Sequence, residues 1–309
     1  MDGLTSLRYA VDGRVARITL SRPERGNAID AALPRELRAC VEQADLDPAV
    51  HVMLLSGEGP GFCGGYDLGL WAQDLGAPDD DPRDRLAPTD PVAIAANHDP
   101  RRTWDPTVDL QMMRRNADAF MSLARADKPV VCKAHGFCVA GGTDLALCSD
   151  LLIVSDDLKI GYPPARVWGS PTTALWASRI GVQRAARLLF TGDSLTGRQA
   201  VEWGLAVESA PADELDERAE DLVQRIARMP RNQLVMMKLL LRQTLTGAGL
   251  DATQALGVLL DGITRHTEEG HAFARQAATE GWRTAVRARD EPFGDHGLRP
   301  NPPRTPGGA

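Results

Sequence analysis

The first stretches of apolar residues predict β-strands. Residues 7–20 alternate apolar and polar positions around Asp12-Gly13, a pair that fits the tight turn of a β-hairpin because glycine tolerates positive φ. Asp30 then precedes apolar residues at helical spacing, which run from Leu33 to Ala44 and stop at Asp47-Pro48. The pattern predicts a hairpin followed by a helix capped by Asp30.

A unit of strand, glycine-rich turn and helix then occurs twice. The apolar run Val50–Ser56 leads into the glycine-rich segment Gly57–Gly65. The run Val130–Ala134 leads into Gly136–Gly142, and residues 143–148 continue as a helix. This recurrence predicts α/β layers, although no internal sequence repeat is detectable.

The second half of the chain has mainly helical periodicity. Residues 151–155 and 159–161 predict two further strands, and from Thr172 onward the apolar spacing is almost wholly helical. Thr196 is expected to cap a helix that ends at Gly204. Within the later helices, residues 236–241 (Met-Met-Lys-Leu-Leu-Leu) are expected to form a buried face.

Two regions interrupt the pattern. Residues 78–109 hold six prolines and eight aspartates in 32 positions, and we expect a surface loop or lid in an insertion spanning residues 76–109. Residues 299–309 are rich in proline and glycine and predict a disordered end to the tail, which spans residues 294–309.

Composition narrows the class of protein. The 309 residues are 43% apolar and 25% charged, enough for one large domain or two modest ones. A net charge of −7, without a cluster of Lys and Arg, argues against nucleic acid as a partner. The absence of a long apolar segment argues against a membrane span. The five cysteines lack the paired spacing of a zinc site, so we expect free thiols, no metal and a cytoplasmic location.

The two glycine-rich segments could form an anion site. Backbone N–H groups at the N-terminal end of a helix have no partner within the helix and favour negative charge. Two such ends facing each other would give one oxygen two fixed donors, as in an oxyanion hole. Neither segment has the spacing of a phosphate-binding or dinucleotide-binding loop. Taken singly, each segment fits a purely structural turn equally well.

At these residues the sequence resembles the crotonase, or enoyl-CoA hydratase/isomerase, superfamily. Several matches occur in family order between residues 14 and 293, which makes the resemblance far more specific than any single motif. The matching stretches are Ser21–Ile29, Gly61–Leu68, Lys128–Leu145, Leu188–Gly192 and Ala200–Val207.

The resemblance implies a fold and an oligomer. We expect a crotonase-like spiral of ββα units in residues 1–195, which would include the acyl-CoA site and the insertion. Residues 196–293 would form a helical C-terminal segment for trimerisation, as a homotrimer or a hexamer built from two trimers.

The resemblance also implies a substrate and residue roles. We expect an acyl-CoA thioester substrate, a place in lipid metabolism and no cofactor beyond the coenzyme A of the substrate. The N–H groups of Tyr66 and Gly141 would hold the thioester oxygen. Further residues fall where family members line the CoA pocket: Arg25, Ala28, Cys63, Gly65, Asp67 and Leu68.

The sequence departs from the family at the two catalytic glutamates. The first position carries Asp144, which is one methylene shorter, and the second carries Pro164, which has no proton to give or take. Thr172 stands where some family branches place another acid. The insertion offers His98 and Asp109 as substitutes, although charged loop residues are more often simply solvated.

These departures leave several functions open. An enoyl-CoA hydratase, with Asp144 moving a proton or positioning water, ranks first. An isomerase, which needs only one carboxylate, and an acyl-CoA hydrolase follow. A trimer that binds acyl-CoA without efficient chemistry is the rival outside the enzymes. A serine hydrolase has little support because no Gly-x-Ser-x-Gly elbow is present.

Overall fold

The predicted hairpin forms one edge of a six-stranded sheet. The computed structural model describes residues 3–71 and 81–294, and in it β1 (Leu7–Asp12) pairs antiparallel with β2 (Val15–Leu20). Gly13 turns between them with a φ of 57°. Four parallel strands follow in the order β3 (Val52–Gly57), β4 (Val130–Ala134), β6 (Leu151–Ser155) and β9 (Glu208–Ala210).

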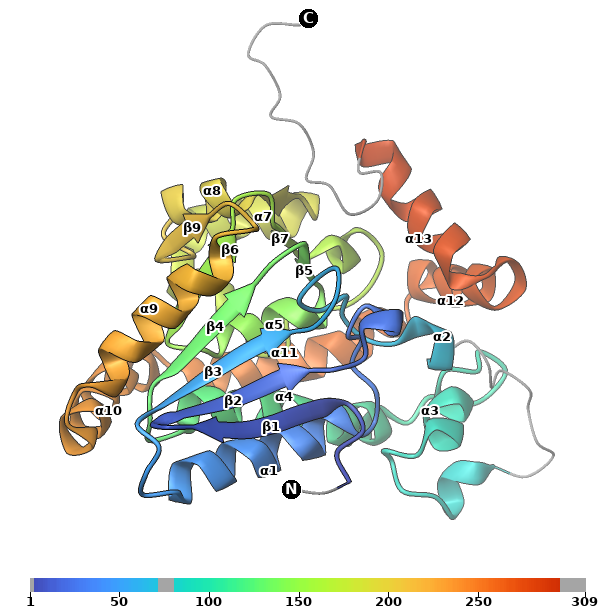
Figure 1. Ribbon diagram of the computed structural model, residues 1–309. Coiled ribbons are helices and arrows are strands. Elements are labelled where there is room, and N and C mark those ends of the chain that lie inside the picture. Colours follow the sequence, from blue (N-terminus) through green and yellow to red (C-terminus); the bar gives the residue numbers. More distant parts are fainter. Residues whose placement is uncertain (1–2, 72–80, 295–309) are drawn as a thin grey trace, which may run out of the picture.

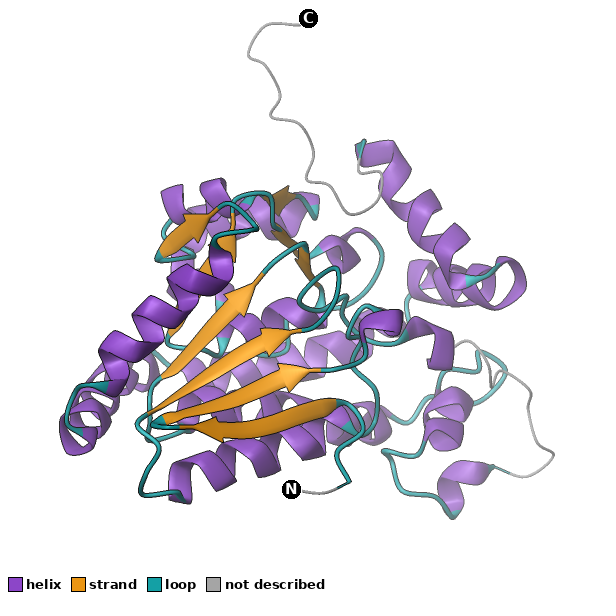
Figure 2. Ribbon diagram, viewed as in Figure 1, coloured by secondary structure: helices purple, strands orange, loops and turns teal. Residues whose placement is uncertain are grey.

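A second, smaller sheet lies at the carboxyl ends of these strands (Figure 2). It contains β5 (Phe137–Val139), β7 (Lys159–Gly161) and β8 (Ser194–Leu195). Strand β4 of the main sheet is followed along the chain by β5 of the smaller sheet and then by helix α5 (Gly141–Leu147). The α/β prediction is therefore confirmed, and the main sheet continues past residue 195 to β9.

Helices cover both faces of the main sheet (Figure 1). Helix α9 (Leu215–Ala227) packs Leu215, Ala219 and Val223 against alternate strand residues such as Val52 and Ile153. The opposite face packs on α1 (Leu33–Leu46), α4 (Pro106–Arg125) and α5. Period-two alternation in the strands explains this division, because successive side chains point to opposite faces.

The predicted cap at Thr196 is present, whereas α1 has Ala32 at its N-cap and Asp30 acts on the helix start from two residues upstream. The Asp30 carboxylate accepts hydrogen bonds from the N–H groups of Ala32 and Leu33 at the start of α1. Thr196 and Gln199 form a reciprocal capping box at α8 (Gly197–Glu202). The remaining short helices are α2 (Leu68–Trp71), α3 (Pro91–Asn97), α6 (Trp176–Ile180) and α7 (Val182–Thr191).

The expectation of a surface loop is wrong for residues 81–109, which form helices and a 3-10 turn, and their role as a lid stays a prediction. Asp-Pro pairs at residues 81–82, 90–91 and 105–106 each begin a helix or 3-10 turn, with the Asp side chain accepting from the N–H two residues later. Proline suits the first helical position, so a composition typical of loops here encodes helix starts. Most of α3 is buried. Residues 76–80 of the expected insertion lie outside the described residues.

The described part of the chain ends in four α-helices, as predicted. They are α10 (Arg231–Gly247), α11 (Leu250–Arg265), α12 (Glu268–Glu280) and α13 (Trp282–Asp290). One of them, α11, packs on α4 behind the main sheet (Figure 1). Lys238 anchors α10 by donating to the carbonyls of Leu123 and Lys128 and pairing with Asp150. Of the expected tail, residues 295–309 lie outside the described part of the chain.

The prediction of a buried face at residues 236–241 is wrong within a single chain. Lys238 is buried, whereas the large apolar side chains of this segment are 40–67% exposed. Helix α10 lies beyond the end of the main sheet at which the parallel strands begin (Figure 1), and its apolar side chains stay partly exposed to solvent there. Within the same described ranges, no helix is both long and apolar enough to span a bilayer.

Candidate functional site

The two glycine-rich segments lie side by side. Cys63 and Cys138 form a parallel bridge, and the Val139 N–H donates to the Cys63 carbonyl at 3.1 Å. Ile29 and Tyr66 form a second parallel β-bridge. The Ile29 carbonyl accepts from the Asp67 N–H, and the Ile29 N–H donates to the Gly65 carbonyl. This pairing leaves the Tyr66 N–H pointing away from Ile29, with no backbone acceptor among the described residues.

Gly141 begins α5, so its N–H belongs to the first turn, where helix N–H groups have no acceptor within the helix. Ala140 precedes it at φ 55° and ψ −129°, a conformation that L-residues rarely adopt and that aims the next peptide group. A methyl group added at Gly65 would lie 3.4 Å from the Gly141 nitrogen. The structure therefore brings the two expected donors together.

The two glycine-rich segments pack closely at Gly65 and Gly141. A methyl group added at Gly141 would lie 2.8 Å from Ile29 Cδ1 and 2.9 Å from Tyr66 Cε2. One added at Gly65, where φ is 93°, would lie 2.7 Å from the Ala140 Cβ. Glycine is required at both positions because the chain segments approach each other closely.

Asp144 lies in the first turn of α5 and is 1% exposed. Its Oδ1 accepts hydrogen bonds from the Thr173 hydroxyl at 2.7 Å and from the Thr173 N–H at 3.1 Å. Its Oδ2 accepts from the Thr172 hydroxyl at 3.3 Å. Thr172, expected only as the site of a missing acid, thus helps to orient this carboxylate.

Burial raises the pKa of Asp144 to about 6, with a further upward contribution from Asp261 that the Thr173 hydrogen bonds partly offset. Burial also raises the pKa of the Tyr66 and Tyr162 phenols, and both aspartates raise these pKa values further. Asp144 is therefore a carboxyl group that can hold or release a proton near neutral pH.

Asp261 is a buried carboxyl group that the sequence reasoning missed. A methyl group added at Gly169 would lie 3.4 Å from the Tyr162 hydroxyl oxygen, 3.5 Å from the Pro164 Cβ and 3.6 Å from Asp261 Oδ1. The Asp261 side chain on α11 and the proline that replaces the second family glutamate therefore both face Gly169. Burial raises the pKa of Asp261, against the opposing effect of Arg265.

The expected lid residues form an ion-pair cluster with α11. Asp109 Oδ2 accepts hydrogen bonds from Trp104 Nε1 at 2.7 Å and Asn97 Nδ2 at 3.1 Å. It also lies 2.8 Å from His266 Nε2, while Oδ1 lies 3.2 Å from Arg265 Nη2. Burial opposes ionisation of Asp109, but these partners outweigh it and hold the pKa of Asp109 well below its usual value. The cluster fastens the start of α4 to the end of α11.

His98, Asp109 and His266 place three potential metal-ligand atoms within 4.8 Å of one another. Their chemistry fits an ion-pair cluster better than a metal centre. The Arg265 guanidinium already occupies one side of the Asp109 carboxylate, and a cation placed there would be repelled. Burial lowers the pKa of His98 to about 4, so this imidazole is neutral at pH 7 and adds a hydrogen bond, not a charge, to the cluster.

The expected CoA-lining residues divide into two groups. Arg25 and Asp67 meet around Gly69 together with the indole of Trp282 from α13, and Arg22 donates to Asp67 Oδ2 at 3.0 Å. Leu68 packs against a small apolar cluster formed by α12 and α13. Ala28, Cys63 and Gly65 are buried, so Cys63 can contribute only its backbone to a pocket.

The cysteines show no sign of nucleophilic chemistry. All five are free and buried. Burial raises the pKa of the Cys138 thiol well above its ordinary value, and Cys138 Sγ donates to the Gly142 carbonyl at 3.3 Å. A thiol with a raised pKa forms little thiolate, so Cys138 fits a packed core residue better than a nucleophile.

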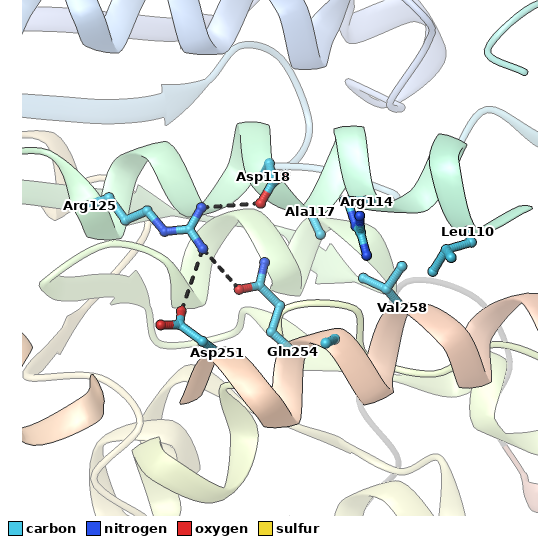
Figure 3. A pocket seen from close by; sticks show the side chains of 9 residues that line it. Leu110, Arg114, Ala117, Asp118, Arg125, Asp251, Gln254 and Val258 are labelled. Carbon is cyan, nitrogen blue, oxygen red and sulfur yellow. Dashed lines mark hydrogen bonds and ion pairs between the residues drawn. The ribbon is translucent and has the colours of Figure 1, made fainter. Parts of the chain in front are cut away.

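A groove of about 290 Å³ lies between α4 and α11 (Figure 3). Arg125 connects the two helices at one end of the groove. It pairs with Asp118 of α4 at 3.1 Å and with Asp251 of α11 at 3.6 Å, and it donates a hydrogen bond to Gln254 of α11. None of the residues expected to bind the thioester lines this groove. An apolar cluster that includes Met112 and Val258 packs against Tyr66 from the same two helices.

Comparison with known proteins gives consistent results. A family model described as enoyl-CoA hydratase/isomerase matches residues 11–89 and 106–276. The crystal structure of an enoyl-CoA hydratase from Mycobacterium smegmatis is 53% identical, has a TM-score of 0.88, and is aligned over 97% of this chain and 98% of that chain.

Two relatives carry names of different activities. The 1,2-epoxyphenylacetyl-CoA isomerase of Escherichia coli is 28% identical over 232 residues, which cover 74% of this chain and 78% of the relative. The hydroxycinnamoyl-CoA hydratase-lyase of Pseudomonas fluorescens is 25% identical over 237 residues, 75% of each protein. All of these names include a coenzyme A thioester, whereas the reactions differ.

Proposed function

Because the chain belongs to the enoyl-CoA hydratase/isomerase family, we propose that its specific reaction is the addition of water to the double bond of an enoyl-CoA. Family membership confirms the crotonase-like fold and makes the chain an acyl-CoA-processing enzyme of lipid metabolism. One observation carries the proposal. The segments that bear the Tyr66 and Gly141 N–H groups lie side by side, and the buried Asp144 carboxyl group belongs to the helix that Gly141 begins.

The two N–H groups would hold the thioester oxygen. When water adds to the β-carbon, electron density moves onto this oxygen and the thioester becomes enolate-like. Fixed backbone donors stabilise that charge, and each can contribute about 3 kcal/mol to the transition state. The first turn of α5 adds a favourable dipole.

Asp144 would take a proton from water or position it. Thr172 and Thr173 fix its orientation, and its raised pKa of about 6 leaves it mainly ionised at pH 7 yet able to bind a proton during turnover. Arg25, Asp67 and Leu68 would contact the CoA portion, with backbone contributions from Ala28, Cys63 and Gly65. The reaction needs no cofactor beyond the coenzyme A of the substrate.

The test is turnover of enoyl-CoA thioesters of increasing chain length, starting with crotonyl-CoA. We expect loss of the conjugated double bond with formation of 3-hydroxyacyl-CoA, and at least a hundredfold lower kcat in Asp144→Asn. Asp118→Asn, an exposed partner of Arg125, is the matched control and should retain activity. Tight acyl-CoA binding without turnover on any chain length would instead support the binding-protein alternative.

Isomerisation is the second candidate. The E. coli relative named as an isomerase supports it, as does Pro164, because a double-bond shift needs only one carboxylate to move a proton between carbons. A 3-enoyl-CoA substrate distinguishes the two reactions. Isomerisation gives the conjugated 2-enoyl-CoA without uptake of water.

We further propose a homotrimer or a hexamer. The support is the exposed apolar surface of α10 and α11, where Leu240 and Leu241 are 65% and 67% exposed in one chain. A cytoplasmic location is supported by the five free, buried cysteines, which suit a reducing compartment.

A further inference from the structure

Asp261 occupies the surroundings that a second catalytic carboxylate would need. It is 7% exposed, and its Oδ1 shares the neighbourhood of Gly169 with the Pro164 side chain and the Tyr162 hydroxyl. A glutamate at position 164 would extend from the same backbone position. Asp261 therefore brings a carboxyl group from α11 into the surroundings of Gly169.

One short segment holds both carboxyl groups. The Ser170 N–H donates to Asp261 Oδ1 at 3.2 Å, and three residues later the Thr173 N–H and hydroxyl donate to Asp144 Oδ1. Gly257 brings α11 against this segment, because a methyl group there would lie 2.8 Å from the Pro171 carbonyl oxygen. Residues 169–173 thus hold the two carboxyl groups in a fixed relation.

Arg265 fixes the other side of Asp261. Its Nη2 lies 3.0 Å from Asp261 Oδ2 and 3.2 Å from Asp109 Oδ1, so one guanidinium links the two carboxylates. Arg265 is 6% exposed and Asp109 is 1% exposed. The Asp109 cluster therefore positions Arg265, and Arg265 takes Asp261 Oδ2 while Oδ1 stays at the Gly169–Ser170 backbone.

We propose that Asp261 is the second acid/base residue of the reaction and replaces the family glutamate lost at Pro164. This inference rests on the proposed hydration of an enoyl-CoA and names the second proton-carrying group of the same site. Asp109 and Arg265 act as positioning residues.

The two carboxyl groups can carry out a balanced addition of water. Asp144 takes one proton from a water molecule as the water oxygen bonds to the β-carbon, and the π electrons of the double bond move toward the thioester oxygen. Asp261, protonated on Oδ1 while Oδ2 accepts from Arg265, gives this proton to the α-carbon as the enolate electrons form the new C–H bond. The net change adds one water molecule, and proton transfer from Asp144 to Asp261, directly or through solvent, restores the starting state.

The test compares Asp261→Asn with Asp251→Asn, an exposed aspartate on the same helix. Enoyl-CoA hydration is followed from pH 5 to pH 9, with acyl-CoA affinity and melting temperature measured for each variant. We expect Asp261→Asn to lower kcat at least a hundredfold, to change KM by less than threefold and to lose one limb of the pH profile. Asp251→Asn should match the wild type.

Three outcomes separate this inference from the proposed function. Absence of hydration by the wild-type enzyme contradicts the proposed function itself. Hydration that collapses in Asp144→Asn but stays within threefold of wild type in Asp261→Asn, with an unchanged pH profile, overturns the role of Asp261 and leaves the function intact. Equal collapse in both variants, with folding and acyl-CoA affinity retained, supports both.

Loss of folding in Asp261→Asn is addressed by a second variant. Asp261→Asn leaves Arg265 its ion pair with Asp109, and Asp261→Ser, which is smaller and also uncharged, gives a second variant without a carboxyl group at this position. Pro164→Glu added to either background restores a carboxyl group beside Gly169. We expect it to recover at least tenfold in kcat, and a folded variant with no recovery would contradict the replacement.

Discussion

Asp144 shows how the environment of a single residue can change its chemistry. Raising a carboxyl pKa from 3.8 to about 6 costs the ionised folded protein roughly 3 kcal/mol. Between pH 4 and pH 6 the folded protein retains a proton that the unfolded chain has released. The free energy of unfolding therefore falls as the pH rises through this window and levels off above it.

Asp144→Asn should remove this cost. An asparagine can still accept from the Thr173 N–H, so we expect the variant to be more stable than the wild type at pH 8, by up to about 3 kcal/mol. The difference should shrink toward pH 4. Denaturant unfolding at both pH values measures it, and a variant less stable than the wild type at pH 8 would contradict the assigned burial cost.

Gly65→Ala should disturb the oxyanion donors through packing as well as backbone strain. Gly65 and Gly204 both have positive φ, 93° and 78°, but a methyl group meets Ala140 at Gly65 and nothing within 4 Å at Gly204. We expect Gly204→Ala to cost about 1–2 kcal/mol and to preserve kcat. Gly65→Ala should also lower kcat by about a hundredfold, because a shift of about 1 Å in the Tyr66 N–H misplaces the thioester. Equal kcat values for the two variants would argue against the donor role of Tyr66.

The candidate-site residues that could be predicted from the sequence are the ones that local motifs encode. Tyr66, Gly141 and Asp144 lie within or directly after glycine-rich segments, so a short motif specifies each of them. Asp261 lies 117 residues beyond Asp144, on a helix whose relation to the sheet depends on tertiary packing. The sequence did contain a signal for a buried polar site on this helix, because Asp261 and Arg265 are charged residues at core-facing positions of a largely apolar helix.

At the scale of elements, two glycines allow α11 to pack closely against its neighbours. Gly257 contacts the 171–172 backbone and Gly262 contacts the Asp109 side chain, so α11 can approach both without a side chain intervening. A bulkier residue at either position would move the helix and with it Asp261. The helix periodicity was predictable from sequence, but these approach distances were not.

Gly257→Ala should therefore act on both stability and catalysis. Its methyl group would lie 2.8 Å from a backbone oxygen that cannot rotate away, and overpacking of this kind typically costs 1–3 kcal/mol. We expect a lower melting temperature and a lower kcat. Gly247→Ala near the end of α10 meets nothing within 4 Å and is the control, expected to keep activity and to be stabilised slightly. Equal behaviour of the two variants would show that α11 does not need this close contact.

The 81–109 segment shows where composition misled the prediction. Its prolines and aspartates are typical of loops, yet each Asp-Pro pair begins a helix or turn. Asp is a good cap and Pro a good first helical residue, so the two interpretations share the same residues. Packing of α3 and α4 against α11 decides between them, and local sequence does not encode that packing.

At the scale of the whole molecule, the proposed trimer rests on the exposed leucines of α10. Leu240→Glu would place a charge in the middle of this apolar face, and we expect light scattering to show the mass of a single chain instead of a multiple of three chains. Leu46→Glu, at an isolated leucine of α1 that is 75% exposed, is the control and should leave the mass unchanged. A wild-type enzyme that is already a single chain would contradict the proposed trimer.

The central claim is that the Tyr66 and Gly141 N–H groups hold the thioester oxygen of an enoyl-CoA. A crystal structure of the Asp144→Asn variant with a bound enoyl-CoA tests it most directly. The account predicts that the thioester oxygen lies 2.7–3.2 Å from both backbone nitrogens, the range of ordinary N–H···O hydrogen bonds. A thioester oxygen beyond hydrogen-bond distance of both nitrogens, with the acyl chain elsewhere in the molecule, would contradict it.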